Sequence, residues 1–399
     1  MGRRRWLILA LGVAAQTSAC SLIYGLPFLV PAMRAAEHLS LARAGVVVSA
    51  PTVGLLFTLI AWGALADRHG ERIVIATGML GCGALTAVAV LMSGLTGFTV
   101  LLVLAGAAGA SVNAASGRVV MGWFAAHERG VAMGVRQTAQ PLGVGIAALF
   151  LPSLAQAYGF RHALWLPAGL CLLCGVLVAV LVVDPPRPRR EPGEPAAGSP
   201  YRTPTLWRLH SASAMLVVPQ FAIAAFALEY LVGGRHWAPG SAGAFLTVVQ
   251  VFGAVGRLGT GYWSDRVGSR LRPMRQLAIA SAAVLGLAAL GDLTGSWLIL
   301  PAIAFGAVIT VADNGLGFTA TAELAGPFWA GRALGVQNTM QNITGALTPP
   351  VLGLVIGGSS YAVAFVVAAG AAVLAIGLTP VAGERGSAVT AVSSRAAGR

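Results

Sequence analysis

The chain has 399 residues, of which 57% are hydrophobic and 10% are charged, and its mean hydropathy is +0.79. Soluble proteins carry about 25% charged residues, so this composition excludes a soluble globular protein and indicates a chain solvated by lipid. A formal net charge of +13 is an excess that attracts polyanions, but the positions of the charges, described below, argue against a nucleic-acid partner.

Long apolar segments follow one another along the whole chain. A helix needs about 20 apolar residues to cross a hydrocarbon core about 30 Å thick, and continuous runs of this length favour helices over the short alternating strands of a barrel. We therefore predict an all-α membrane protein with twelve transmembrane helices. In chain order they cover 6–30, 44–65, 73–93, 98–121, 130–155, 162–183, 208–231, 240–262, 275–292, 297–320, 333–357 and 360–381. Prolines within these segments, such as Pro141, permit kinks.

The first of these helices begins with Arg3, Arg4 and Arg5 and has features of a signal peptide that ends near Cys20. Its apolar stretch continues to Val30, which is long enough to cross the membrane, so we interpret it as a transmembrane helix. The four cysteines all lie in predicted helices, and no group of His, Cys or acidic residues has the spacing of a metal site. We expect no metal and no cofactor.

The basic residues are distributed asymmetrically. All 26 are arginine. With the N-terminus placed inside, four face outside and three lie within helices, which leaves 19 of the 26 on the cytoplasmic side. Cytoplasmic loops of membrane proteins concentrate positive charge in this way. A chain rich in alanine, glycine and arginine but without lysine also suits a GC-rich bacterial genome. We predict a multi-pass protein of a bacterial inner membrane with both termini in the cytoplasm.

Residues 184–206 (DPPRPRREPGEPAAGSPYRTPTL) interrupt the apolar pattern and hold seven of the 21 prolines. Such a segment forms no regular buried element, so we interpret it as a cytoplasmic linker. It separates a six-helix half at 1–183 from a second six-helix half at 207–382, and we expect 383–399 to be a disordered cytoplasmic tail.

Two sequence patches recur in both halves. Gly63–Gly70 (GALADRHG) matches Gly261–Gly268 (GYWSDRVG), and Gly130–Gln140 (GVAMGVRQTAQ) matches Gly331–Gln341 (GRALGVQNTMQ). Both patches lie at predicted cytoplasmic ends, so the two halves have the same orientation. A parallel repeat of six plus six helices is typical of transporters that bind substrate between the halves and alternate access by rocking.

At these residues the chain resembles the major facilitator superfamily over nearly its whole length. The segment Gly63–Ile73 (GALADRHGERI) is similar to the signature that follows the second helix of that family, although Glu71 stands where a basic residue is usual. Gly117–Gly143 (GRVVMGWFAAHERGVAMGVRQTAQPLG) further resembles the cyanate and nitroimidazole transporter-like branch, which is related to nitrate and monocarboxylate transporters.

The resemblance implies a transporter for a small molecule, not an enzyme, with a conformational switch in the signature loop. It implies that this loop latches onto the end of the eleventh helix in the outward-open state, and the alternative is an ordinary charged turn. The switch candidates are Gly63, Asp67, Arg68, Gly70 and Arg72, with Asp265 and Arg266 in the second copy.

Arg257 is the sharpest candidate for a contact with substrate. It lies two turns before Asp265, or about 12 Å deeper, where a charge costs about 2.5–3.5 kcal/mol and usually faces a cavity or a partner. A guanidinium suits carboxylates and oxyanions, and the position resembles the anion-binding arginine of nitrate and monocarboxylate transporters. Leu59 and Gly253 stand where those two families, respectively, carry a second Arg or an Asp. The alternative is an arginine that snorkels to the interface or pairs with Asp265.

Other polar residues within the predicted helices are further candidates for the substrate cavity. Arg136 begins a polar face that includes Gln140, and its repeat partner is Gln337, so the repeat does not require its charge. Polar residues at the repeat interface line the site in transporters of this kind, but they can equally bond helices together. The remaining candidates are Gln16, Tyr24, Asn113, Gln220, Asn314 and Gln341.

Asp313 is the most deeply embedded carboxylate of the predicted helices. Burial disfavours the charged form of a carboxylate, so Asp313 is a candidate carrier of a co-transported proton. The alternative is a structural residue, neutral or paired with Arg136 or Arg118.

We predict a secondary transporter that acts as a monomer in the lipid bilayer and carries a small organic or inorganic anion. The alternative is a proton-coupled efflux pump for drugs or metabolites, for which we expect a larger apolar cavity without a committed arginine. No nucleophile–base pair and no paired carboxylates stand at membrane depth, so we predict no catalytic residues.

Overall fold

The computed structural model describes residues 2–39, 41–185 and 198–384, and this part of the chain is helical, without strands. Residues 186–197 of the predicted linker and residues 385–399 of the predicted tail lie outside the described residues.

The first half contains long helices and several short helical elements between them. They are α1 (Gly2–Ile23), η1 (Leu26–Leu29), α2 (Val30–Glu37), α3 (Leu41–His69), α4 (Glu71–Leu91), α5 (Leu95–Trp123), η2 (Ala126–Glu128), α6 (Arg129–Gln137), α7 (Ala139–Tyr158), α8 (Phe160–Ala163) and α9 (Trp165–Leu181). The second half contains η3 (Pro200–Arg202), α10 (Pro204–Glu229), η4 (Tyr230–Gly234), α11 (Pro239–Val267), α12 (Leu271–Leu293), α13 (Ile299–Ala312), α14 (Asn314–Ala325), α15 (Ala330–Gly358) and α16 (Tyr361–Leu378).

Ten helical stretches in the described part of the chain are long and apolar enough to cross a membrane. α11 and α15, each 29 residues long, are two further long helices; α15 carries Gln337, Asn338 and Gln341. Large apolar side chains stay on the outside, as with Phe57, which is 83% exposed. The predicted all-α architecture is confirmed, and the count of twelve transmembrane helices stays a prediction that these elements fit.

Two predicted helices are broken, and one ends early. The predicted helix 130–155 forms as α6 and α7, which meet at Thr138, because Pro141 has no N–H to donate to the carbonyl of Gln137. The predicted helix 297–320 breaks into α13 and α14 at Asp313. The predicted helix 6–30 was too long: α1 ends at Ile23, and the helical elements η1 and α2 follow.

The described residues pack into two compact units. Unit 1 lies within 1–124, 135–195 and 326–339, and unit 2 lies within 125–134, 196–325 and 340–399. Each unit therefore includes a short segment from the other half of the sequence. The start of α15 belongs to unit 1, whereas η2 and most of α6 belong to unit 2.

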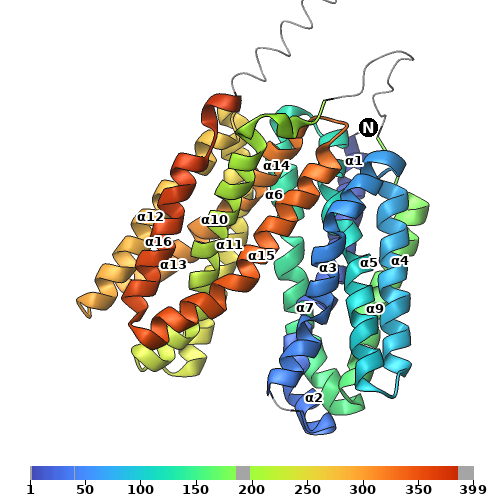
Figure 1. The fold of residues 1–399 in the computed structure, drawn as a ribbon, viewed down its shortest axis with the longest axis horizontal. Coiled ribbons are helices and arrows are strands. Elements are labelled where there is room, and N and C mark those ends of the chain that lie inside the picture. Colours follow the sequence, from blue (N-terminus) through green and yellow to red (C-terminus); the bar gives the residue numbers. More distant parts are fainter. Residues whose placement is uncertain (1, 40, 186–197, 385–399) are drawn as a thin grey trace, which may run out of the picture. The chain divides into compact units, whose positions relative to one another are not determined.

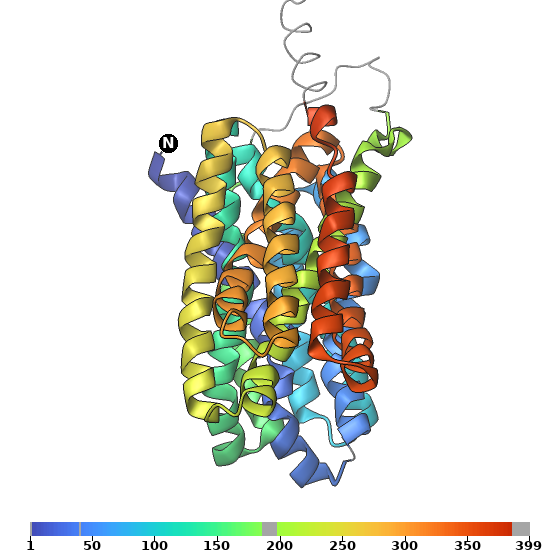
Figure 2. The same cartoon turned by 90° about the vertical axis from the view of Figure 1, so that its left-hand side faces the viewer.

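Each unit has its own apolar core. In unit 1, α5 packs against α3 and α4, and α4 also packs against α9. The backbones of α3 and α5 touch, since a Cβ on Gly106 would lie 2.0 Å from the carbonyl oxygen of Pro51. In unit 2, α16 packs against α10 and α12, and α13 packs against α11 and α12 (Figure 1). The turned view shows α11 in yellow and α16 in red running in nearly the same direction (Figure 2).

Candidate functional site

Asp67 joins the end of α3 to the start of α15 within unit 1. Its two carboxylate oxygens accept hydrogen bonds from the backbone N–H groups of Gly331 at 2.8 Å and Arg332 at 3.0 Å. The first N–H groups of a helix have no partner inside the helix, and the helix dipole favours an anion there. One turn before Asp67, a Cβ on Gly63 would lie 2.3 Å from the carbonyl oxygen of Gly331. The spacing Gly-x-x-x-Asp therefore places a bare backbone and a carboxylate against one helix terminus.

Arg118 of α5 holds the Asp67 carboxylate from the other side. Its Nη1 donates to Asp67 Oδ1, and its Nε donates to Oε1 of Glu71 at 2.7 Å. The side chains of Asp67 and Glu71 are each 2% exposed, and that of Arg118 is 10% exposed. Removing one partner of a buried ion pair leaves an uncompensated charge. These three residues therefore depend on one another. Glu71, which departs from the resembled signature, is thus the second counter-ion of Arg118.

A second cluster, in unit 2, repeats the geometry of the first. Asp265, at the end of α11, accepts hydrogen bonds from the backbone N–H groups of Gly130 and Val131, both at 2.9 Å. A Cβ on Gly261 would lie 2.3 Å from the carbonyl oxygen of Gly130. The Asp-containing patch of each sequence repeat therefore binds the Gly-containing patch of the other repeat. Both aspartates lie in the last turn of a helix, not in the loop that the sequence indicated.

The ion pairs around the two aspartates have opposite polarity. Arg270, just before α12, donates to Asp265 at 2.5 Å, and its Nε donates to Glu323 of α14 at 3.4 Å. Glu323 also pairs with Arg129 at 3.4 Å. In unit 1 the glutamate begins α4 and the arginine lies on α5, whereas in unit 2 the arginine precedes α12 and the glutamate lies on α14. The pair is kept, but its charges are exchanged.

An acidic residue that follows the last helix of each half caps a neighbouring helix. Asp184, after α9, accepts a hydrogen bond from the backbone N–H of Arg72 at 2.8 Å. Glu384, after α16, accepts hydrogen bonds from the backbone N–H of Arg270 and from the hydroxyl of Ser269. Sequence reasoning singled out neither residue. Their shared position after the last apolar helix of each half was the available signal.

The other predicted switch residues have different surroundings. Arg68 and Arg266 are exposed, and the Arg266 guanidinium lies 4.8 Å from the ring centre of Tyr262. The Arg72 side chain donates to the carbonyl of Ala179 in α9 at 2.8 Å. Gly70 has φ of 102°, a backbone region that favours glycine, and makes the turn into α4.

Arg136 lies in a closed hydrogen-bond network in unit 1. Its Nε donates to the Ser116 hydroxyl at 2.7 Å, its Nη2 to the Asn113 carbonyl at 2.8 Å, and its Nη1 to the Gln137 side chain at 2.6 Å. Gln16 donates to the Asn113 side chain at 3.0 Å and accepts from Ser116 at 3.1 Å. The structure thus brings three predicted residues, Gln16, Asn113 and Arg136, together. Tyr24 is half-buried on the segment after α1, and Gln140 is exposed on α7.

Arg257 lies in unit 2 with much of its hydrogen-bonding capacity unused. Its Nε donates to the Val311 carbonyl at a long 3.4 Å, and its two terminal nitrogens donate no hydrogen bond within the described part of the chain. Its charge interacts with that of Asp313, which is 3% exposed at the junction of α13 and α14. The alternative pairing of Arg257 with Asp265 is not observed, since Arg270 and the start of α6 occupy that carboxylate. The charged neighbour of Asp313 is Arg257, not Arg118 or Arg136.

The remaining predicted residues of unit 2 form a chain of amides. Asn314 donates to the Gln220 side chain at 3.0 Å, and Gln341 donates to the Asn314 side chain at 3.3 Å. These residues come from α10, α14 and α15. The sequence had named all three, but it gave no indication that they are bonded to one another.

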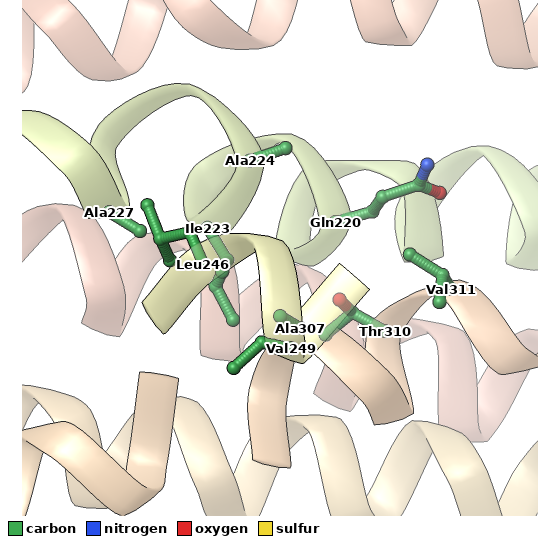
Figure 3. Close-up of a pocket in the computed structure, with 9 residues that line it drawn as sticks. All are labelled: Gln220, Ile223, Ala224, Ala227, Leu246, Val249, Ala307, Thr310 and Val311. Atoms are coloured by element: carbon green, nitrogen blue, oxygen red, sulfur yellow. The ribbon is translucent and has the colours of Figure 1, made fainter. Parts of the chain in front are cut away.

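A small pocket lies in unit 2 between α10, α11 and α13. Figure 3 shows Gln220 and Val311 toward one end of the pocket and Ala227 and Leu246 toward the other. The lining residues are Gln220, Ile223, Ala224, Ala227, Leu246, Val249, Ala307, Thr310 and Val311. Of these, the sequence had singled out Gln220 alone, because the others are ordinary apolar or small residues of transmembrane helices.

Comparisons with known proteins fit this architecture. A model of the Major Facilitator Superfamily matches residues 7–349. An uncharacterized MFS-type transporter of Mycobacterium tuberculosis is 42% identical over 380 residues, which cover 94% of this chain and 85% of the relative. The hexuronate transporter of Bacillus subtilis is 21% identical over 359 residues, which cover 84% of this chain and 85% of the relative. A crystal structure of the E. coli fucose:proton symporter FucP has a TM-score of 0.74 at 18% identity and covers 94% of this chain and 98% of that chain.

The family model and the Mycobacterium tuberculosis relative both extend over most of the chain, and the fold agrees with that of a solved transporter. The chain belongs to the major facilitator superfamily and is a multi-pass membrane protein for secondary transport.

Proposed function

We propose that this transporter carries a small organic or inorganic anion across a bacterial inner membrane by alternating access, with Arg257 as the anion-binding residue. The observation that supports this role of Arg257 is that its terminal nitrogens can still donate hydrogen bonds. Its terminal nitrogens donate no hydrogen bond to the described residues, whereas Nε, Nη1 and Nη2 of Arg136 all have partners. A guanidinium presents such nitrogens as a fork that matches a planar carboxylate or oxyanion. The resemblance of Gly117–Gly143 to a branch related to anion transporters agrees with this assignment.

Asp313 supplies the coupling in this proposal. Asp313 lies near the Arg257 charge, which is its charged neighbour. An anion that binds Arg257 competes with the carboxylate for the same cation, and a buried carboxylate that loses its counter-ion favours the protonated form. Substrate and proton would therefore bind together, with one chain as the transport unit.

The clusters around Asp67 and Asp265 act as the conformational switch in this proposal. α15 begins in unit 1 and continues into unit 2, and α6 begins in unit 2 and ends in unit 1. Each aspartate binds the start of one of these two helices. Movement of one unit relative to the other would strain the contacts at both helix starts, so their release would accompany the change of access. We place both clusters on the cytoplasmic side.

Binding measurements on Arg257 variants test the anion proposal. A charge-assisted hydrogen bond in a desolvated site contributes about 1.5–3 kcal/mol, so Arg257→Ala should weaken anion affinity by roughly tenfold to a hundredfold. Arg257→Lys keeps the charge but loses the fork, so it should recover only part of the affinity. Thermal-shift and calorimetric titration of purified protein with small organic acids, nitrate and cyanate would measure this.

Arg275→Ala is the matched control, because Arg275 is an exposed arginine on α12 of the same unit. It should bind anions like the wild type. Melting temperatures of the same preparations separate lost binding from lost folding. Wild-type anion affinity in a well-folded Arg257→Ala protein would contradict the proposal and favour efflux of neutral or cationic compounds.

A further inference from the structure

The start of α10 and the preceding η3 form an aromatic cluster in unit 2. The ring centre of Tyr201 lies 5.0 Å from that of Trp207 and 5.8 Å from that of His210, and the Tyr201 hydroxyl and His210 Nε2 are 3.0 Å apart. His210 is buried, whereas Trp207 is 50% exposed. Tyrosine and tryptophan concentrate where a membrane protein passes through the headgroup region, so this cluster indicates the depth of the lipid headgroups.

Two exposed arginines flank the cluster. Arg202 directly follows Tyr201, and Arg208 directly follows Trp207. Arg208 Nη2 donates to the carbonyl of Gly377 in α16 at 2.8 Å. The other nitrogens of Arg208 and the side chain of Arg202 donate no hydrogen bond to the described residues. Most of the donors of these two guanidinium groups are therefore available to a ligand.

The bond to Gly377 places Arg208 at the end of an exposed apolar stripe on α16. α16 lies in a segment that is long and apolar enough to cross a membrane, so its exposed side chains are solvated by lipid. In Figure 2 the start of α10, in green, and the end of α16, in red, lie at the same end of the unit. The stripe recurs at intervals of three and four residues, which is one face of a helix, and includes Val363, Val367, Gly370, Leu374 and Gly377.

The positive charge at this place is not neutralised by the acidic residue that follows α16. The Glu384 carboxylate accepts hydrogen bonds from the Ser269 hydroxyl and from the backbone N–H of Arg270, so it is engaged at the start of α12.

The sequence repeat does not require the charge either. The spacing that relates Gly130 to Gly331 also relates Trp6 to Trp207, which places Leu7 at the position of Arg208. The tryptophan is common to both halves, and the arginine belongs to the second half alone.

From this arrangement we infer that the start of α10 and the end of α16 form a binding site for an anionic phospholipid. The phosphate binds the remaining N–H groups of Arg202 and Arg208, since a planar guanidinium suits a phosphate. Trp207 borders the glycerol region, and an acyl chain lies along the stripe of α16. A soluble phosphate would make the first contact but not the last, so the site selects a lipid. It is separate from the proposed substrate site at Arg257 and does not depend on the transported compound.

Native mass spectrometry of the purified full-length protein tests the headgroup contact, with phosphatidylglycerol and phosphatidylcholine of the same acyl chains as probes. The wild type should bind phosphatidylglycerol more tightly. Arg202→Gln and Arg208→Gln should each weaken that binding by roughly fivefold and leave phosphatidylcholine unchanged, and Arg208→Lys should recover part of the affinity. Arg275→Gln removes the same charge from an exposed position on α12 of this unit and is the matched control.

Gly377→Leu tests the contact with α16. A Cβ on Gly377 would meet nothing within 4 Å, so the fold should be preserved. The leucine would fill the space beside Arg208 that the lipid uses, and binding of phosphatidylglycerol should weaken. Gly286→Leu, at an exposed position of α12 where a Cβ also has nothing within 4 Å, is the matched control. Melting temperatures of the same preparations separate lost binding from lost folding.

The outcomes decide between a lipid site and a general attraction of charges. A preference for phosphatidylglycerol that Arg202→Gln, Arg208→Gln and Gly377→Leu reduce, but Arg275→Gln and Gly286→Leu do not, would support the site. Arg202→Gln is informative even where Arg208→Gln is unstable, because the Arg202 side chain makes no hydrogen bond to the described residues. An equal loss in Arg275→Gln, or equal binding of both lipids by the wild type, would overturn the inference. Displacement of the lipid by glycerol phosphate at a similar concentration would also overturn it, because that anion has no acyl chain.

Discussion

The arginines that bind Asp67 and Asp265 occupy different positions in the two halves. Arg118 lies on α5 and is held by Glu71 at the start of α4. Arg270 lies just before α12 and is held by Glu323 of α14. In both clusters an aspartate and a glutamate share one arginine, whose side chain is 10% exposed in the first cluster and 6% exposed in the second. An unpaired buried charge is costly on either helix. The stability of the cluster therefore depends on the presence of both partners more than on which helix supplies the arginine.

An exchange of charges within the first cluster tests this equivalence. Glu71→Arg alone leaves two buried cations together, and loss of a buried partner lowers the free energy of unfolding by about 3–5 kcal/mol. Arg118→Glu alone should be similarly harmful. The double variant, Glu71→Arg with Arg118→Glu, has the polarity of the second cluster and should recover most of the stability in detergent. A double variant no more stable than the worse single variant would show that the two clusters are not equivalent.

The aspartates themselves should control transport rate more than stability. Asn in place of Asp67 keeps one acceptor oxygen but places an amide NH₂ against the N–H groups of α15 and against Arg118. Asp67→Asn should therefore be expressed normally and transport more slowly in proteoliposomes, and Asp265→Asn should behave alike. Arg275→Ala, at an exposed position of α12, is a control for general effects of substitution on expression. Wild-type flux in both aspartate variants would reduce the clusters to structural ion pairs.

At the level of secondary structure, the termini of the helices carry the specific contacts, while their middles carry the apolar packing. The starts of α4, α6, α12 and α15 each receive a carboxylate, from Asp184, Asp265, Glu384 and Asp67 in that order. A helix start has unpaired N–H groups and a positive dipole, so an acidic residue stabilises it in every case. The break at Thr138 has a similarly local cause in Pro141, whose missing N–H ends α6.

Removal of the two terminal caps should give parallel effects. Glu384→Ala and Asp184→Ala each remove an acceptor from a helix start, which costs about 1 kcal/mol. Both should lower the melting temperature of the purified protein by a few degrees, and Glu384→Gln, which keeps an acceptor oxygen, should lower it less. The effect of Glu384→Ala should be the larger of the two, since Glu384 also binds the Ser269 hydroxyl. A Glu384→Ala protein as stable as the wild type would argue against a capping role.

At the scale of the whole molecule, the orientation of the protein in the membrane is a prediction that can be tested by labelling. The arginine distribution places both termini and residues 184–206 in the cytoplasm, and residues 31–42 and 233–239 outside. The four native cysteines are buried, so a cysteine-free background should fold after conservative replacement. In that background Ala36→Cys and Ala238→Cys should react with an impermeant maleimide in intact cells, whereas Arg190→Cys should react only after lysis. Strong labelling at position 190 in intact cells would contradict the predicted topology.

The sequence by itself determined the all-α class, the transmembrane helices, the superfamily and the repeated patches around Asp67 and Asp265. The length of an apolar segment and the spacing of a repeated motif are local properties, so they can be recognised in the sequence without the structure. Breaks in helices were harder to place, because the position at which a long helix gives way depends on its neighbours as well as on its own residues. Hence Pro141 was recognised as a kink site, but the break at Asp313 was not.

Only the tertiary structure decided which charges are partners. Nothing in the spacing of Glu71, Arg118, Arg270 and Glu323 shows that they form two ion pairs of opposite polarity, because their contacts join residues from different helices. The same holds for Arg136 and Arg257, which look alike as buried arginines in a sequence. One has its donors satisfied by Ser116, Asn113 and Gln137, and the terminal nitrogens of the other donate no hydrogen bond to the described residues. Hydrogen bonds are short-ranged and directional, so which arginines have their donors satisfied appears only once the helices are packed.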